Sequence, residues 1–346
     1  MSSKKTEKKF FAIFSFIVVS FMFIAPYLIL PKVYEGRSEW LDTAPPNAVF
    51  LELWEIDTFE GGNAGRARFL EKTAYLYQDI TLSTYVLVRS LELEQAKSML
   101  ENGTKPDMIS FGIGAGDILA SLAHTITSSS VRSDLQAGGI QDGSIKAVPW
   151  CFGGYLLCST KIEDLSYNNL SSLQDSSELK VIGTGYNFNQ PNKTLTDEEL
   201  SLLDKTERTQ YKAYESFLRG NEFQVLLGTQ RDFHRLNNKV NLGVLDNVNY
   251  RYLDSYTDLI QYISITTPNP ELIEPAHKFI NYLTSHQTQK RLTSIGMFGV
   301  NNEKIYTNEY QDFENALSNK LQVTNVFTSN VTIKEKQKEV FQCNNS

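Results

Sequence analysis

The stretch that decides the fold is LELWEIDTFEGGNAGRARFLEKTA, residues 51–74. It begins inside an apolar, β-favouring run at 48–54, which predicts a first strand. Residues 55–63 carry two adjacent glycines and predict a loop. At 66–78 apolar residues return at the spacing of one helical face, so a helix is expected after the loop. The apolar positions of that helix are Phe69, Leu70, Ala74 and Tyr77.

The same alternation continues downstream. Residues 84–89 predict a second strand and 91–101 a second helix. A third strand at 108–111 leads into a glycine-rich turn at 112–118. Strands that alternate with helices in this way form a mostly parallel sheet with helices on its faces. Ligands of such sheets bind beyond the carboxyl ends of the strands, so the loops that follow these three strands are candidate site positions.

The rest of the chain also reads as α/β. Strands are expected at 145–149, 150–159, 222–228 and 263–266, and helices at 200–218, 271–295, 308–317 and 332–342, with a turn at 229–232.

The N-terminus predicts a membrane segment. Residues 1–9 hold four lysines and one glutamate, a net charge of +3, and residues 10–30 form 21 consecutive uncharged positions. A helix of that length covers about 30 Å, the thickness of a bilayer's hydrocarbon core. By the positive-inside tendency, the basic tip is cytoplasmic, and the body beyond a polar stalk at 31–46 is extracellular. The expected location is therefore the cell membrane, spanned once.

Two interpretations of residues 10–30 remain open, an uncleaved signal anchor and a cleaved signal peptide. The apolar run is longer than the about 7–15 residues usual in a signal peptide, and no A-x-A-like cleavage site follows it. Both observations favour the anchor. Both interpretations place the body outside the cytoplasm.

Composition narrows the function classes. The 346 residues are 41% hydrophobic and 21% charged, which is globular, and the length suggests about two domains. The net charge of -7 argues against a nucleic-acid partner. Cys151 and Cys158 are expected to be small buried side chains, and the odd count of three leaves at least one thiol unbridged. The four histidines share no ligand spacing, so neither a metal nor a cofactor is expected.

Several stretches resemble the extracellular solute-binding proteins of family 1, the sugar-binding type that serves ABC importers. One is the opening stretch at 51–74. The others are LENGTKPDMISFG at 100–112, KAVPWCFGGYLLCS at 146–159, FQVLLGTQRDFHRL at 223–236 and ITTPNPELIEPAHKFINYLTSHQTQKRL at 265–292. The lipid-modified cysteine usual in the family is missing, and the second lobe looks short.

The resemblance implies an α/β, two-lobed, periplasmic-binding-protein-like fold of type II behind an N-terminal transmembrane helix. Lobe 1 would comprise 47–155 and 262–300, and lobe 2 would comprise 156–261 and 301–346. A small polar solute, a sugar above all, would be captured between the lobes and delivered to ABC permease subunits. No bond would be made or broken, so the resemblance implies no catalytic residue.

Candidate ligand contacts follow from loop positions and from sugar chemistry. Aromatic faces suit the C–H surface of a sugar, and planar polar groups suit its hydroxyls. Trp150, beside a glycine pair, is the favoured stacking platform. Packing in the core would equally explain the aromatic candidates of this region and Trp54. The carboxylates of Asp57 and Glu60 could equally be solvated surface groups, and Arg231 and Asp232 could equally form a surface ion pair. The candidate ligand-binding residues are Trp54, Asp57, Glu60, Phe111, Asp117, Trp150, Tyr155, Gln230, Arg231 and Asp232.

Two other functions compete with solute capture for import. One is a ligand-sensing ectodomain that reports occupancy to a membrane signalling protein. The other is an exported hydrolase that uses Asp57 and Glu60 as a carboxylate pair. Residues three apart in a flexible loop make a poor acid/base pair without a scaffold, so the sequence favours a binding protein.

Overall fold

The computed structural model describes residues 45–59, 65–127, 130–163, 165, 179–183, 193, 195–204, 210–219, 222–329 and 331–335. The predicted basic tip at 1–9, the membrane segment at 10–30 and nearly all of the stalk lie outside this part of the chain. Within it, no helix combines the length and the apolar character needed to cross a bilayer. All elements below belong to one compact unit, Val49–Ser346.

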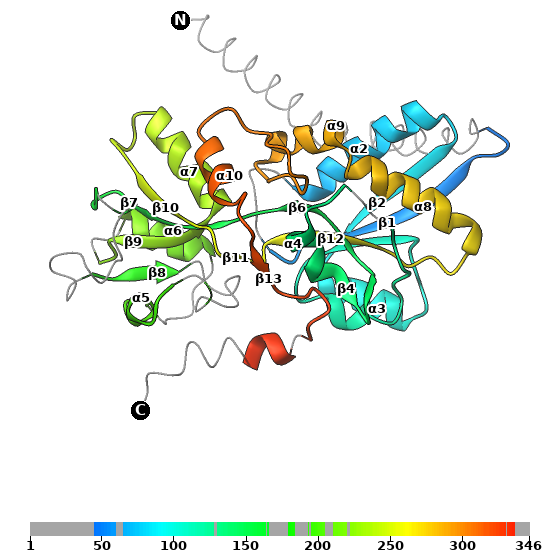
Figure 1. Cartoon of the computed structure of the whole chain (residues 1–346), viewed down its shortest axis with the longest axis horizontal. Coiled ribbons are helices and arrows are strands. Elements are labelled where there is room, and N and C mark those ends of the chain that lie inside the picture. Colours follow the sequence, from blue (N-terminus) through cyan, green and yellow to red (C-terminus); the bar gives the residue numbers. More distant parts are fainter. Residues whose placement is uncertain are drawn as a thin grey trace, which may run out of the picture. The chain divides into compact units, whose positions relative to one another are not determined.

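A five-stranded sheet is built around the strand of the opening stretch (Figure 1). Its order is β2-β1-β3-β12-β6, in which β1, β2 and β3 are parallel and β12 runs antiparallel to both of its neighbours. The predicted parallel arrangement therefore holds for the first three strands. The bounds are β1 Val49–Ile56, β2 Thr84–Leu91, β3 Met108–Phe111, β6 Val148–Phe152 and β12 Ile260–Ile265.

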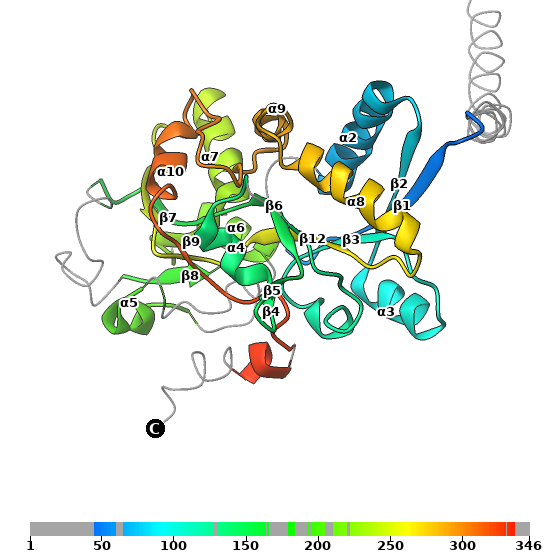
Figure 2. The ribbon, with the colours of Figure 1, turned by 45° about the vertical axis from the view of Figure 1, so that its right-hand side comes forward.

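Helices cover both faces of this sheet. Helix α2 (Arg66–Thr81) and helix α8 (Pro270–Leu283) lie on one face, and α3 (Leu93–Glu101) lies on the other (Figure 2). Side chains alternate along β1 accordingly: Leu51 and Leu53 share a core with α2 and α8, whereas Trp54 and Ile56 share a core with α3. A strand buried on both faces in this way is typical of a parallel sheet. Glu55 has the same parity as Leu51 and Leu53, so its carboxyl enters the core.

A second, four-stranded sheet has the order β10-β7-β9-β8. Only β8 and β9 are parallel in it. Helices α6 and α7 pack on β9, and α10 packs on β10. The bounds are β7 Tyr155–Ser159, β8 Val181–Gly183, β9 Val225–Thr229, β10 Asn249–Leu253, α5 Asp197–Ser201, α6 Gln210–Arg219, α7 Gln230–Asn241 and α10 Gln311–Ala316.

The chain passes between the two sheets through adjacent segments. Strand β6 leads through Gly153 and Gly154 into β7, and the strand β11 (Tyr256–Thr257) leads back into β12. The two crossings are joined, because Gly153 donates its N–H to the Leu259 oxygen at 2.7 Å. A Cβ on Gly153 would lie 2.3 Å from the Gln230 amide, so a larger residue would force the buried Gln230 side chain to move. The strand predicted at 150–159 is divided between two sheets at its glycine pair, and Gly153 makes the close backbone approach that glycines within a strand indicate.

A segment near the C-terminus, residues 317–327, spans elements of both sheets, and we call it the C-terminal strap. Its strand β13 (Gln322–Val323) pairs with β11 beside the crossings. Further along, the Val326 N–H donates to the Gly138 oxygen at 2.8 Å. The Val326 oxygen sits so close to Gly116 that a Cβ there would lie 2.1 Å from it. The strap thus covers the predicted glycine-rich turn. The proposed lobe boundaries stay a prediction.

Local corrections have local causes. The turn expected at 229–232 is the start of α7, where the Thr229 and Asp232 side chains cap the helix reciprocally. The helix expected at 200–218 is replaced by α5 and α6, and that expected at 271–295 ends as α8 at Leu283. The remaining short elements are β4 Ile140–Gln141, β5 Ser144–Ile145, α4 Ser133–Gln136, α9 His286–Gln289 and 3₁₀ helices at Gly116–Ile118, Ala137–Gly139 and Lys290–Ile295.

The two cysteines of the crossing region behave as expected. Cys151 and Cys158 are both buried and unbridged, so their prediction as small buried side chains is confirmed. Burial raises the pKa of both thiols well above the usual value. Neither thiol is therefore a nucleophile at neutral pH.

Candidate functional site

The carboxyl ends of β1, β3 and β6 meet at one edge of the five-stranded sheet, together with the amino end of β12. This is the edge at which open α/β sheets bind ligands. Three strands present buried polar side chains there: Glu55 from β1, Ser110 from β3 and Gln261 from β12. Polar groups in an otherwise apolar core need a structural or functional explanation.

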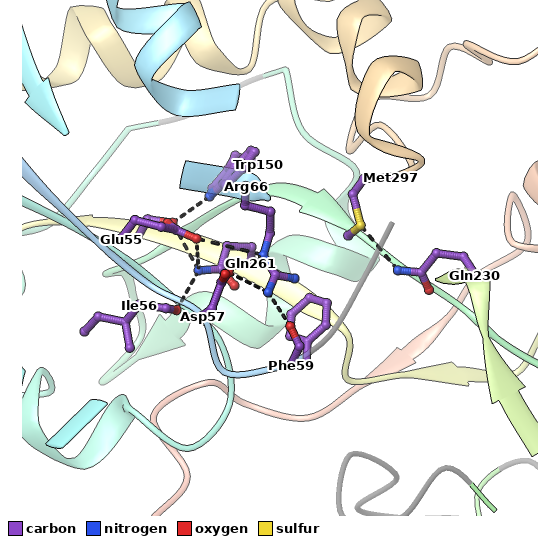
Figure 3. A network of polar contacts seen from close by, with 10 residues as sticks. Glu55, Ile56, Asp57, Phe59, Arg66, Trp150, Gln230, Gln261 and Met297 are labelled. Carbon is purple, nitrogen blue, oxygen red and sulfur yellow. Dashed lines mark hydrogen bonds and ion pairs between the residues drawn. The ribbon is translucent and has the colours of Figure 1, made fainter. Parts of the chain in front are cut away.

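Gln261 joins these strands. Its Nε2 lies 3.2 Å from Glu55 Oε1, 3.2 Å from Ser110 Oγ and 3.0 Å from the Ile56 oxygen (Figure 3). An amide nitrogen has two hydrogens, so these three acceptors share them. The Trp150 indole also donates to Ser110 Oγ, at 3.0 Å. The amide is thereby fixed in position with its nitrogen occupied.

Arg66 brings a positive charge to the same edge from the first turn of α2. Its Nε donates to Asp57 Oδ1 at 2.7 Å, and its Nη2 lies 2.6 Å from the same oxygen and donates to the Phe59 oxygen. The Phe59 ring packs under the guanidinium, 4.0 Å from its central carbon. Arg66 is only 3% exposed, whereas the Asp57 side chain is 50% exposed. The ion pair therefore reaches from the core to solvent.

Glu55 is completely buried beside this pair. Burial, as the largest cause, raises its pKa from 4.5 to about 8, while the charge of Arg66 opposes the rise. Arg66 is 3.9 Å away through Nε and is bonded more closely to Asp57. At pH 7 the Glu55 carboxyl is consequently mostly protonated and neutral.

Four buried polar atoms at this edge have no hydrogen-bond partner within the described part of the chain: Glu55 Oε2, Thr58 Oγ1, Arg66 Nη1 and Gln261 Oε1. We call these four residues the edge cluster. Thr58 Oγ1 and Gln261 Oε1 surround the same point, because a Cβ on Gly112 would lie 2.2 Å from the first and 3.4 Å from the second. An unsatisfied buried group costs about 1–3 kcal/mol. The cluster combines donors with acceptors, which is the complement of a hydroxylated molecule.

One predicted site residue, Asp57, belongs to this arrangement as the partner of Arg66. Trp54 points to the opposite face of the sheet, is fully buried and donates from Nε1 to Glu52 at 2.8 Å. Phe111 is buried against Phe327 of the C-terminal strap, with 5.9 Å between ring centroids. A ligand role for these two aromatic side chains stays a prediction.

The predicted stacking platform, Trp150, is also fully buried. The Phe69 ring stacks on it, with centroids 5.7 Å apart and planes 10° apart. Tyr155 is buried as well, and its hydroxyl donates to Asp258 at 2.6 Å. In this conformation both rings already have protein partners, and their ligand role stays a prediction.

The candidates of the second sheet lie in the first turn of α7. Gln230 is buried at the crossing, where its Oε1 accepts from Gly154 N at 3.1 Å and its Nε2 lies 3.3 Å from Met297 Sδ. A thioether is a weak acceptor, so a ligand oxygen would be a better partner for this amide. Asp232 is buried as the helix cap, and Arg231 beside it is partly exposed.

Two further candidates lack a described side chain. Glu60 lies outside the described residues, and Asp117 belongs to a 3₁₀ helix although its side chain is not described. Nothing can be said of their contacts.

The sequence prediction missed all four residues of the edge cluster. Two of them left a signal in the patterns used for the fold. Glu55 occupies an inward position of β1, and Arg66 occupies the buried stripe of α2 that continues with Phe69 and Leu70. A charged residue at a core position of a strand or helix marks a site more directly than does its place in a loop.

A cavity of about 40 Å³ lies elsewhere in the structure. It has room for a few waters but not for a sugar ring. No cluster of His, Cys, Asp and Glu suited to a metal ion occurs among the residues that the structure describes. The lining residues of the cavity are Arg132, Phe152, Gly299, Asn301, Asn302, Glu303, Lys304, Glu314 and Ser318.

No protein-family model matches the chain, and no curated protein matches it. Solved structures do. The sugar-binding protein MalE from Xanthomonas citri has a TM-score of 0.66 at 12% identity, over 86% of this chain and 93% of that chain. The GacH receptor of Streptomyces glaucescens, solved unliganded and with acarbose, has a TM-score of 0.59 at 11% identity, over 86% and 94%.

Maltose-bound MalE3 from T. maritima is similar too, with a TM-score of 0.57 at 13% identity over 85% of this chain and 95% of that chain. Likeness at such low identity is a likeness of fold. The chain thus has the mixed α/β fold of the two-domain, MalE-like binding proteins, and the predicted fold class is confirmed at that level. The likeness is to binding proteins rather than to enzymes.

Proposed function

We propose that this chain captures a carbohydrate, or a similar small hydroxylated solute, at the edge cluster. The observation that carries the proposal is the set of four buried, unsatisfied polar atoms at the ligand-binding edge of a sheet. The support from the fold is that its solved neighbours are sugar-binding proteins, one of them solved with maltose. A sugar hydroxyl both donates and accepts, so sugar hydroxyls complement a free donor such as Arg66 Nη1 and a free acceptor such as Gln261 Oε1.

The second sheet would supply the opposite side of the site. Gln230 is placed at the crossing between the sheets and holds its amide nitrogen against a weak acceptor. A solute that contacts Gln230 and the edge cluster together would favour the closed arrangement of the two lobes, because it would bind that arrangement more tightly. Capture of this kind needs no chemical step. Asp57, half of the carboxylate pair of the hydrolase hypothesis, is instead held by Arg66.

We further propose that the protein works outside the cell as part of an ABC importer. The uncharged segment at 10–30 would anchor it in the membrane, with the basic tip at 1–9 in the cytoplasm. ABC permease subunits would then receive the solute. These statements rest on the sequence pattern and on the family resemblance.

The test is isothermal titration calorimetry of the full chain in detergent against glucose, maltose, maltotriose and xylobiose. We expect saturable binding of at least one sugar, and at least about tenfold weaker binding by Gln261→Leu, which removes one unsatisfied acceptor and the amide donor. Gln287→Leu changes the same residue type at an exposed position and should bind as the wild type does. A folded wild-type chain that binds none of these sugars contradicts the proposal.

A further inference from the structure

We propose that Glu55 contacts the captured solute as a neutral carboxylic acid, donating a hydrogen bond from Oε2 to a solute oxygen. The inference rests on the proposed function and deepens it. It makes Glu55 a specificity-determining residue that selects uncharged, hydroxylated solutes, and it makes their capture dependent on pH.

The two oxygens of Glu55 are not equivalent. Oε1 lies 3.2 Å from the Gln261 amide nitrogen and 3.9 Å from Arg66 Nε, so it is the oxygen that faces donors. Oε2 is buried and faces no donor within the described residues. An ionised oxygen in such a place would lack both water and a partner, which is strongly unfavourable. A proton on Oε2 turns this oxygen into a hydrogen-bond donor, which a solute oxygen can accept from.

The charged and titratable groups around Glu55 leave it protonated. From α2, Arg66 faces it, but this guanidinium bonds Asp57 at 2.7 Å through Nε and at 2.6 Å through Nη2. Asp57 itself adds a negative charge, and the Cys151 thiol on β6 is neutral. From β3, a hydrogen bond of Ser110 lowers the pKa of Glu55, whereas a hydrogen bond of Asp57 raises it. From β12 comes the uncharged Gln261.

Strand β2 pairs the uncharged Ser90 with Glu55, and helix α8, which also packs on β1, buries only apolar side chains: Ala276, Phe279, Ile280 and Leu283. Among the described residues, the cation that favours the ionised form of Glu55 is Arg66, and its charge is already paired with the nearer Asp57. Complete burial favours the neutral form. The pKa of Glu55 is raised to about 8 by that burial, in agreement with the geometry.

This protonation state sets the chemistry of the edge cluster. Glu55 and Arg66 offer hydrogens, Gln261 Oε1 accepts one, and the Thr58 hydroxyl does either. The Arg66–Asp57 pair has no net charge, so the cluster as a whole is neutral at pH 7. An uncharged solute with hydroxyl and ether oxygens offers both the donors and the acceptors that these four groups lack. An anionic solute would bring a charge into a buried region whose cation, Arg66, already has a counter-ion in Asp57.

The consequence is a linkage between proton and solute. When Glu55 ionises, Oε2 can no longer donate, and it repels an ether oxygen placed against it, because an ether oxygen has no hydrogen to donate. If only the protonated form binds, affinity is constant well below pH 8 and falls about tenfold for each pH step above it. Glutamine in place of Glu55 carries an amide nitrogen that donates at every pH.

The experiment measures the Kd of glucose, maltose and xylobiose from pH 6 to pH 9.5 for the wild type, Glu55→Gln and Glu52→Gln. For the wild type we expect an about tenfold weaker Kd at pH 9 than at pH 7. Glu55→Gln should show a flat profile over the same pH range. Glu52→Gln removes a partly exposed carboxyl from the same strand and should keep the wild-type profile.

The outcomes separate this inference from the proposed function. Sugar binding with a pH-independent wild-type Kd overturns the neutral role of Glu55 and leaves sugar capture standing. A Glu55→Gln profile that weakens with pH as the wild-type profile does, in a chain that unfolds cooperatively, also overturns it. A wild type that binds none of the three sugars overturns both proposals. The wild-type profile decides the question by itself if Glu55→Gln does not fold.

Discussion

Replacing Glu55 with glutamine should make the folded chain more stable at neutral pH. The unfolded chain loses the Glu55 proton near pH 4.5, whereas the folded chain keeps it to about pH 8. Below pH 4.5 both states hold the proton, so the full stability is present. As the pH rises from 4.5 to 8, losing the Glu55 proton stabilises the unfolded state but not the folded state, so the free energy of unfolding falls. Glutamine has no proton to lose.

The magnitude follows from these two pKa values. Each pH step between them is worth about 1.4 kcal/mol, so the wild type should lose about 3 kcal/mol of unfolding free energy between pH 4.5 and pH 7 through this group. The difference between Glu55→Gln and the wild type should grow with pH over that interval and level off above pH 8. Urea denaturation followed by tryptophan fluorescence, at each pH from 5 to 8, measures it.

The matched control is Glu94→Gln, because the Glu94 side chain is 83% exposed and its pairing with Lys97 lies on the surface. Its profile should run parallel to that of the wild type. Parallel profiles for Glu55→Gln as well would show that the Glu55 carboxyl titrates alike in the folded and unfolded chains. That result would refute the argument that the edge cluster holds a neutral carboxyl.

Three other changes test the surrounding structure. Gly116→Ala should displace the C-terminal strap, because the new Cβ would lie 2.1 Å from the Val326 oxygen. Amide hydrogen exchange should become faster in the strap and stay the same elsewhere. Unchanged exchange in the strap would contradict this contact. Trp150→Phe removes the hydrogen bond of the indole N–H and should lower the free energy of unfolding by about 1–3 kcal/mol. Its sugar affinity should stay within about twofold of the wild type. A large loss of affinity without loss of stability would instead support the predicted stacking role of Trp150. In a chain that carries Cys343→Ser, Cys151 and Cys158 should resist a thiol reagent in the folded state and react with it in urea, because burial raises the pKa of both thiols. Rapid labelling of the folded chain would contradict their burial.

The first half of the fold was readable from the sequence because its signals are local. The strands β1, β2 and β3 and the helix α2 each carry the hydrophobic period of their own secondary structure, and the structure places them within a few residues of the predicted bounds. Three loops at one edge of a parallel sheet then follow from topology alone.

The sequence failed where the chain passes between sheets. The run at 150–159 is apolar throughout, so its period cannot show that Gly153 and Gly154 end one strand and begin another in a different sheet. Strand β10 was missed for a related reason. Its sequence, NYRYL, is mostly half-buried and lacks a clear alternation of apolar and polar residues.

The candidate site was only partly readable. The place of Asp57 after β1 predicts a site residue, whereas the hydrophobic period that predicts α2 concerns only apolar positions and therefore leaves out its partner Arg66. Gln261 makes its contacts with Glu55 across 206 positions of sequence, and no local pattern contains that pairing. The aromatic residues chosen as platforms are in the core, where large apolar side chains are found most often.

The most direct test of the central claim is the sugar affinity of Thr58→Val. The Thr58 hydroxyl is buried without a partner in the described chain, so valine, which has nearly the same shape, should leave the stability unchanged or raise it. If the edge cluster holds a sugar, the same change should weaken binding about tenfold, while Thr104→Val at an exposed position should not. Unaltered affinity in Thr58→Val, for a sugar that the wild type binds, would contradict the account.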